Sequence, residues 1–287
     1  MHHKLIVDFE DLNLSDLKLI MKKVVLVTGG SSGIGKSLAL YLQEKNYTVY
    51  GTSRTPSNYP DSSIKLLALD VQDQDSINKA VKELIKKEGQ LDILINNAGV
   101  GITGPMEETP IEEVKNAMET NFYGPLRVLQ AVLPQMRAQK SGRVINITSI
   151  AGYMGLPYRG IYSASKGALE IATEAYRMEC AHLNIHFSNV APGDFATNIA
   201  AGRFHAPVVS GSDYEAGYAH TLKLIDEHVD DGQDPIEVAT KIYEILQKEN
   251  PGIHYKVGSF LQKFSIVLKK ILPEKTYENM LKKHYGL

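Results

Sequence analysis

Short apolar segments alternate with longer segments of mixed polarity along most of this chain. The short segments are rich in β-branched residues and are bounded by glycine, proline or polar residues, a pattern that predicts buried β-strands. We predict strands at 24–29, 47–53, 64–70, 91–99, 142–149 and 185–193.

The segments between these strands place apolar residues three or four positions apart, which indicates helices. Strands that are apolar on both faces and alternate with helices are typical of a parallel sheet covered by helices on each side. No internal repeat or linker interrupts the pattern, so we predict one α/β domain from about residue 21 to the end. The predicted helices are 37–45, 75–87, 112–138, 162–183 and 235–248.

Residues 1–20 precede this pattern. Met21 opens the sequence MKKVVLVTGG, in which two lysines lead directly into the first strand, as at a natural start. We therefore expect residues 1–20 to be an N-terminal extension outside the domain, or the product of a mis-assigned start.

The composition excludes several classes of protein. Among 287 residues, 43% are hydrophobic and the net charge is −2, so no basic excess favours nucleic acid as a partner. No apolar run approaches the roughly 20 residues of a membrane span. The one cysteine, Cys180, allows no intrachain disulfide, which is consistent with a reducing compartment, and we predict a cytoplasmic protein. The nine histidines show no metal-ligand spacing, so no metal site is predicted.

A glycine-rich turn follows the first strand. The sequence TGGSSGIG at 28–35 allows a tight turn and lets a pyrophosphate approach the N–H groups of the next helix. The spacing of Gly29, Gly33 and Gly35 differs from the GxGxxG dinucleotide fingerprint. A tight turn without a ligand is the alternative.

The end of the second strand bears on cofactor choice. Arg54 lies nineteen residues after Gly35, where an acidic residue would bind the ribose hydroxyls of NAD. Ser53 and Arg54 stand there instead, and a guanidinium matches a 2′-phosphate, so NADP(H) is favoured over NAD(H). A solvent-facing arginine is the alternative.

Tyr162 and Lys166 are four residues apart in the sequence YSASK. On a helix both side chains rise from one face and reach the same place. A tyrosine, with an ordinary pKa of about 10, needs nearby positive charge to act as a base near neutral pH. Taken alone, the pair favours a solvated helix face that carries a tyrosine and a lysine.

Several motifs in order resemble the short-chain dehydrogenase/reductase family. They are TGxxxGxG at 28–35, NNAG at 96–99, Asn121, Ser149, YSASK at 162–166 and PGDFAT at 192–197, with Tyr162 thirteen positions after Ser149. The resemblance covers residues 22–285. It implies an oxidoreductase with a seven-stranded, doubly wound (Rossmann) parallel sheet.

The resemblance also implies roles for individual residues. Tyr162 would be the catalytic acid/base, Lys166 would hold the nicotinamide ribose, and Ser149 would polarise the substrate carbonyl. Asn121 would kink its helix and bind a water that relays protons. Asp70 would meet the adenine amine, and Thr197 the carboxamide of nicotinamide. The full cofactor set is Thr28, Gly29, Ser31, Ser32, Gly33, Ile34, Gly35, Ser53, Arg54, Asp70, Val71, Asn97, Ala98, Gly99, Tyr162, Lys166, Pro192, Gly193 and Thr197.

The substrate pocket should form above the carboxyl ends of the strands. Its expected walls are 101–106, 152–158 and a lid at about 194–218; they are mostly apolar, and no arginine clearly faces them. The sequence at 152–170 is similar to that of hydroxysteroid and retinol dehydrogenases, which implies a lipophilic ketone or alcohol as substrate; simple packing of the loop is the alternative.

Two other functions remain open. A non-catalytic NADP(H)-binding regulator on the same fold would usually lack the tyrosine or the lysine. An epimerase or dehydratase would usually have a larger C-terminal domain and another glycine spacing.

The C-terminal segment 253–287 contains seven lysines and two glutamates, with apolar residues at helical intervals. A basic amphipathic helix of this kind covers its own core or a partner subunit more often than an anionic membrane surface. The family resemblance implies a homodimer or homotetramer formed through 112–138 and 162–183.

Overall fold

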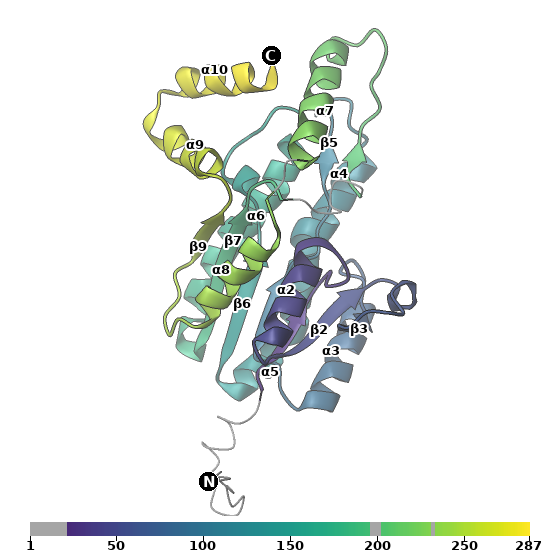
Figure 1. Cartoon of the computed structure of the whole chain (residues 1–287), viewed down its shortest axis with the longest axis vertical. Coiled ribbons are helices and arrows are strands. Elements are labelled where there is room, and N and C mark those ends of the chain that lie inside the picture. The colour runs from purple at the N-terminus through teal and green to yellow at the C-terminus, as the bar shows by residue number, and fades with distance from the viewer. Residues whose placement is uncertain (1–21, 196–201, 231–232) are drawn as a thin grey trace, which may run out of the picture.

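A seven-stranded parallel sheet forms the centre of the molecule (Figure 1). The computed structural model describes residues 22–195, 202–230 and 233–287. The strand order is β3-β2-β1-β4-β6-β7-β9. Strands β1 to β3 are added toward one edge of the sheet, and the strands from β4 onward are added toward the other edge, so the strand order reverses between β1 and β4. The strands are β1 (Val24–Val27), β2 (Thr48–Ser53), β3 (Lys65–Ala68), β4 (Ile93–Asn96), β6 (Gly142–Ile147), β7 (Ile185–Pro192) and β9 (His254–Val257).

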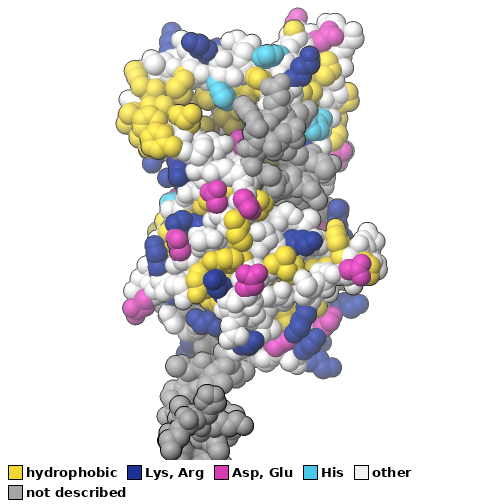
Figure 2. Space-filling model, viewed as in Figure 1, with side chains coloured by type: hydrophobic (Ala, Val, Ile, Leu, Met, Phe, Trp, Pro, Cys, Tyr) yellow, Lys and Arg dark blue, Asp and Glu magenta, His cyan; other side chains and the backbone are white. Residues whose placement is uncertain are grey.

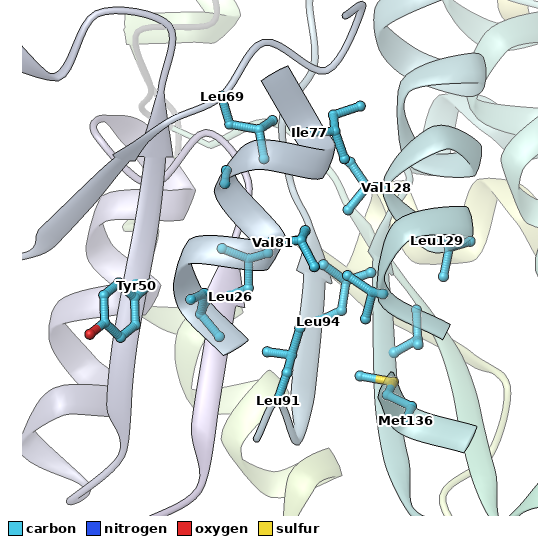
Figure 3. Packing of buried hydrophobic residues seen from close by; sticks show 14 of the residues in the cluster. Leu26, Tyr50, Leu69, Ile77, Val81, Leu91, Leu94, Val128, Leu129 and Met136 are labelled. Carbon is cyan, nitrogen blue, oxygen red and sulfur yellow. The ribbon is translucent and has the colours of Figure 1, made fainter. Parts of the chain in front are cut away.

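Helices cover both faces of the sheet. On one face, α2 (Gly33–Glu44) and α8 (Ile236–Leu246) pack against Val25, Val27 and Ile95. On the other face, α3 (Gln74–Glu88), α5 (Gly124–Gln139) and α6 (Gly160–Glu179) cover the alternate residues of the same strands, and Figure 3 shows Leu26 and Leu94 among them. All residues of β1 and β4 are buried, because successive side chains enter opposite apolar layers. The predicted fold class is confirmed.

The predicted helix at 112–138 is divided into three parts. It begins as α4 (Ile111–Met118), continues as a π-helical turn (Glu119–Tyr123) and ends as α5. Asn121 lies inside the π-helical turn, where a wider turn changes the direction of its backbone groups.

The sequence pattern missed three strands. β9 extends the edge of the sheet, and β5 (Ile102–Thr103) pairs in parallel with β8 (Phe204–His205) in a small second sheet above it. In β9 only Val257 is buried, so this edge strand lacks the continuous apolar run of the inner strands. Short 3₁₀ turns lie at Pro56–Asn58, Ile150–Tyr153 and Ala181–Leu183.

The C-terminal segment forms two helices, α9 (Phe260–Ile271) and α10 (Glu274–Tyr285), at the same end of the molecule as α7 (Glu215–Asp230) (Figure 1). Of the two, α10 contacts α7. A capping box starts α9: Ser259 accepts from the Gln262 N–H, and the Gln262 side chain accepts from the Ser259 N–H. Ile266 of α9 and Tyr277 of α10 pack with Ile150 and Met154 in a small core of their own. Part of the basic tail therefore covers the protein's own core. Throughout the described ranges, no helix is long and apolar enough to cross a membrane.

Candidate active site

The glycine turn after β1 is tied to the end of β4. Thr28 Oγ1 accepts hydrogen bonds from the backbone N–H groups of Asn97 (2.9 Å) and Ala98 (3.0 Å). The Asn97 side-chain amide donates in return to the carbonyl oxygens of Thr28 (3.0 Å) and Gly29 (3.1 Å). Gly29 has φ +64° and Gly33 has φ +52°, which L side chains rarely adopt. These contacts hold the turn open at the point where the strand order reverses.

The start of α2 fits a pyrophosphate. Its N-cap residue, Ser32, makes no side-chain capping bond, and the first turn of the helix has no acidic residue. Its first N–H groups are therefore available to an anion, which the helix dipole also favours.

A crevice runs from this turn along the carboxyl ends of β2, β3 and β4. Twelve of the predicted cofactor residues line it: Gly29, Ser31, Ser32, Gly33, Ile34, Ser53, Arg54, Asp70, Val71, Asn97, Ala98 and Gly99. Residues that the sequence analysis did not name complete the lining, and they include Thr55, Asn58, Tyr59, Gln72, Asn116 and Thr120. Thr28 is buried beneath the crevice and shapes it through Asn97 and Ala98.

A second pocket adjoins the crevice and shares Ile34, Asn97, Gly99 and Val100 with it. Ser149, from the end of β6, lines this pocket together with Tyr162 and Lys166 from the first two turns of α6. The predicted cofactor residues Pro192 and Gly193 line it as well. The topology thus brings together three residues that the sequence analysis assigned to catalysis.

Lys166 is buried in this pocket. Its Nζ donates to the carbonyl oxygen of Ile147 at 3.0 Å. Burial lowers the pKa of the Lys166 ammonium from its ordinary value, and electrostatic interactions with Tyr162 and Glu170 partly offset that effect. A Cβ added at Gly99 would lie 3.3 Å from Lys166 Nζ and 3.2 Å from Asn121 Oδ1, so glycine keeps this space open.

The Ser149 hydroxyl has protein partners. Its Oγ accepts from the Ala151 N–H at 3.2 Å and lies 3.5 Å from the Pro192 carbonyl oxygen. The hydroxyl proton is thus held weakly, which leaves it able to turn to a stronger acceptor in the pocket.

Asn121 is fully buried and lies outside the pocket lining. Its Oδ1 accepts from the Val100 N–H at 2.8 Å, and its Nδ2 donates to the Val100 carbonyl (2.9 Å) and to Ser165 Oγ (3.1 Å). Its side chain therefore fastens the π-helical turn to the loop after β4 and to α6.

Two arginines line the pocket, where the sequence analysis expected none. The expectation that no arginine faces the site is wrong: Arg159 and Arg203 both line the pocket, and the Arg159 guanidinium lies 5.4 Å from the Tyr162 ring centre. Asp194 lines it too, and its Oδ2 accepts from Gln262 Nε2 at 2.7 Å. Arg159 lies in the loop before α6, in a stretch without periodicity, so no pattern indicated its direction.

Thr197, part of the expected lid at 194–218, lies outside the described residues. Gly35 does not line the crevice; a Cβ there would collide with the Gly29 carbonyl oxygen and the Asn97 amide. In the part of the chain that the structure describes, no three histidine, cysteine or acidic side chains gather as metal ligands.

Known proteins with similar sequences are oxidoreductases. Residues 23–207 match the family model described as short chain dehydrogenase. The chain is 38% identical to a 3-ketodihydrosphingosine reductase of Bacteroides thetaiotaomicron, over 92% of this chain and 98% of that protein. It is 32% identical to the mouse 17-beta-hydroxysteroid dehydrogenase type 1, over 81% of this chain and 72% of that protein.

Solved structures give the same result. A short-chain dehydrogenase from Streptomyces avermitilis has a TM-score of 0.73 and 30% identity, over 90% of this chain and 98% of that one. ElxO with NADP bound has a TM-score of 0.67 and 28% identity, over 83% and 98%. A Burkholderia phymatum enzyme in complex with NAD shares the fold, with a TM-score of 0.74 and 20% identity over 87% and 93%. With its parallel sheet, its dinucleotide crevice and these relatives, the chain belongs to the short-chain dehydrogenase/reductase family and is an oxidoreductase.

Proposed function

We propose that the protein is an NADP(H)-dependent reductase of a lipophilic ketone, with a long-chain 3-keto sphingoid base as the leading substrate. The proposed hydride transfer rests on one observation, which is that the catalytic pocket adjoins the crevice. The pocket of Ser149, Tyr162 and Lys166 shares four lining residues with this crevice. A nicotinamide dinucleotide lying along the crevice would bring its reactive ring to these three side chains.

The residues that would hold the cofactor have distinct tasks. Arg54 would pair with the 2′-phosphate at the end of β2, and the uncapped start of α2 would receive the pyrophosphate. Lys166 would donate to the nicotinamide ribose. When bound, the reduced cofactor supplies the hydride to the carbonyl carbon.

The chain's own side chains manage charge and proton at the carbonyl oxygen. Ser149 would turn its hydroxyl proton from Pro192 to the substrate oxygen, where negative charge grows during reduction. Tyr162 would donate its phenolic proton to the same oxygen, and the Lys166 ammonium would stabilise the phenolate that remains. In the reverse direction Tyr162 would accept the proton of the alcohol.

Two observations support the substrate class. The relative named as a 3-ketodihydrosphingosine reductase matches this chain over nearly the full length of both. A 3-keto sphingoid base carries an ammonium beside its ketone, and the Asp194 carboxylate lines the same pocket as Ser149 and Tyr162. That carboxylate offers the ammonium a partner of opposite charge.

The test is a panel of ketones assayed through NADPH absorbance, with NADH in parallel and Tyr162→Phe as the inactive control. We expect 3-ketodihydrosphingosine to be reduced with a higher kcat/KM than a steroid ketone such as estrone, and NADPH to be preferred over NADH. Turnover of the steroid alone would reject the sphingoid assignment, and equal use of NADH would reject the role of Arg54. Absence of turnover with every ketone and both cofactors would favour the non-catalytic regulator.

A further inference from the structure

The outer face of α9 carries large hydrophobic side chains in water. Phe260, Leu261 and Ile271 are 72%, 76% and 66% exposed, and Phe264 and Val267 beside them are exposed as well. We call these five residues the α9 stripe. Figure 2 shows a patch of hydrophobic side chains at the upper left, in the place where Figure 1 shows α9. Soluble proteins rarely expose contiguous apolar patches unless the patch binds something.

The stripe forms one continuous face of the helix, because its residues recur at helical spacing. Phe260, Phe264, Val267 and Ile271 follow one another at intervals of four, three and four, which places them in one row. The rings of Phe260 and Phe264 stack with centroids 5.5 Å apart. The opposite side of α9 already packs on the protein through Ile266. The helix therefore does not need the stripe for its own attachment.

The charges beside the stripe favour an anionic partner. Lys263 and Lys270 are exposed and lie seven residues apart, so both border the same edge of the stripe. The third lysine, Lys269, instead donates to the Tyr153 carbonyl oxygen at 2.7 Å. The segment 258–273 contains no acidic residue. A helix with an apolar row and lysines along its edge matches an anionic bilayer, whose surface attracts the ammonium groups while the apolar side chains enter the acyl boundary.

A second copy of the chain fits this face less well. Pairing two α9 helices about a twofold axis makes the same patch face itself. The lysine edges would then approach helices that offer no carboxylate to pair with them. A bilayer supplies both the apolar interior and the negative charge.

We propose that the α9 stripe docks the protein on the surface of an anionic lipid bilayer. Contact between α9 and a bilayer would bring the catalytic pocket close to the membrane, because Gln262 on the same helix holds Asp194 at the rim of this pocket. A substrate dissolved in the bilayer would enter beside the membrane-facing helix. The binding of vesicles does not depend on which ketone is reduced, so this proposal and the proposed function can fail separately.

The experiment is flotation of the intact protein with vesicles of phosphatidylcholine alone and of phosphatidylcholine with an equal part of phosphatidylglycerol. One variant, Phe260→Ser/Leu261→Ser, removes apolar side chains, and another, Lys263→Gln/Lys270→Gln, removes charge. The matched control, Ile111→Ser/Ile236→Ser, changes exposed isoleucines at the starts of α4 and α8. Thermal unfolding verifies that each variant folds, and size-exclusion chromatography follows the oligomeric state.

We expect the wild type and the control to float with the anionic vesicles and to dissociate at high salt. Loss of the two lysines should weaken binding about thirtyfold, from roughly fivefold for each charge. Loss of the two apolar side chains should weaken it at least about tenfold. Failure of the wild type to float, or equal binding by the Phe260→Ser/Leu261→Ser variant, would overturn the proposal. Loss of a dimer in that variant without any vesicle binding would assign the stripe to a second copy and would also overturn it.

Discussion

Replacing Gly35 by alanine tests the geometry of the cofactor turn most directly. The added Cβ would lie closer to the Gly29 carbonyl oxygen and to Asn97 Nδ2 than the 3.0 Å that real Cβ atoms keep. The Gly29 oxygen belongs to the backbone, so no change of rotamer relieves that collision. The methyl group would also press against both partners of the hydrogen bond from Asn97 Nδ2 to the Gly29 carbonyl.

The size of the effect follows from these contacts. Overpacking against backbone costs about 1–3 kcal/mol. Displacing the Asn97 side chain weakens its two hydrogen bonds, to Thr28 and Gly29, at about 1 kcal/mol each. The sum is roughly 3 kcal/mol or more, which for a chain of this length lowers Tm by roughly 6–12 °C. The N–H groups at the start of α2 move with the turn, so the KM for NADPH should rise at least about tenfold.

The assay is thermal unfolding of the protein without cofactor, followed by measurement of the KM for NADPH. Gly155→Ala is the matched control, because a Cβ at Gly155 meets nothing within 4 Å and its φ is not in the left-handed region. We expect the control to keep the wild-type Tm and the wild-type KM. If Gly35→Ala unfolds at the wild-type temperature and binds NADPH as tightly, the contact between Gly29, Gly35 and Asn97 is not the one described, and the reasoning fails.

Three further substitutions separate catalysis, cofactor choice and stability. Tyr162→Phe should lower kcat by about 10²–10⁴-fold and leave the KM for NADPH within about twofold, and a variant that keeps most of its kcat would contradict the acid/base role. Arg54→Ala should raise the KM for NADPH about tenfold, a modest effect because the ion pair of an exposed arginine is weak. The KM for NADH should not change, because NADH lacks the 2′-phosphate that Arg54 would bind. Lys166→Met should abolish turnover yet unfold above the wild-type temperature at neutral pH. Burial lowers the pKa of Lys166 in the folded protein, so the buried ammonium destabilises the fold. This destabilisation is complete at pH values below the pKa in the folded protein, and it disappears above the pKa of about 10.4 in the unfolded chain. The difference in Tm between this variant and the wild type should therefore narrow toward alkaline pH, and a difference that is constant with pH would argue against a charged, buried Lys166.

The inner strands were predictable from the sequence because each is buried on both faces. Residues 24–27 and 93–96 are continuous apolar runs apart from Asn96. Such a run can be recognised in the local sequence, without knowledge of contacts to distant residues. β9 was not predictable in this way, because an edge strand with one buried residue shows no such run. The helical pattern did not show the π-helical turn at Glu119–Tyr123, and a kink at Asn121 was expected only from the family resemblance.

The motif residues of the site were predictable, and the residues that would set specificity were not. Ser149, Tyr162 and Lys166 stand at fixed positions on strand and helix ends, so local structure brings them together. Asp194 belongs to the PGDFAT motif and to the expected lid, but its hydrogen bond to Gln262, sixty-eight residues further along the chain, was not predictable. Arg159 is a loop residue whose direction depends on packing with the C-terminal helices. Contacts between segments so far apart in the chain leave no local pattern.

The C-terminal helices have a consequence for engineering the enzyme. Tyr285 of α10 is buried and hydrogen-bonded to Arg159, which flanks Tyr162, and Leu287 packs against α7 at Gly217. None of these C-terminal contacts lies in the crevice that would hold the dinucleotide. Grafting residues 258–287 from a relative would thus replace the partners of two pocket residues, Gln262 for Asp194 and Tyr285 for Arg159, and leave the crevice unchanged.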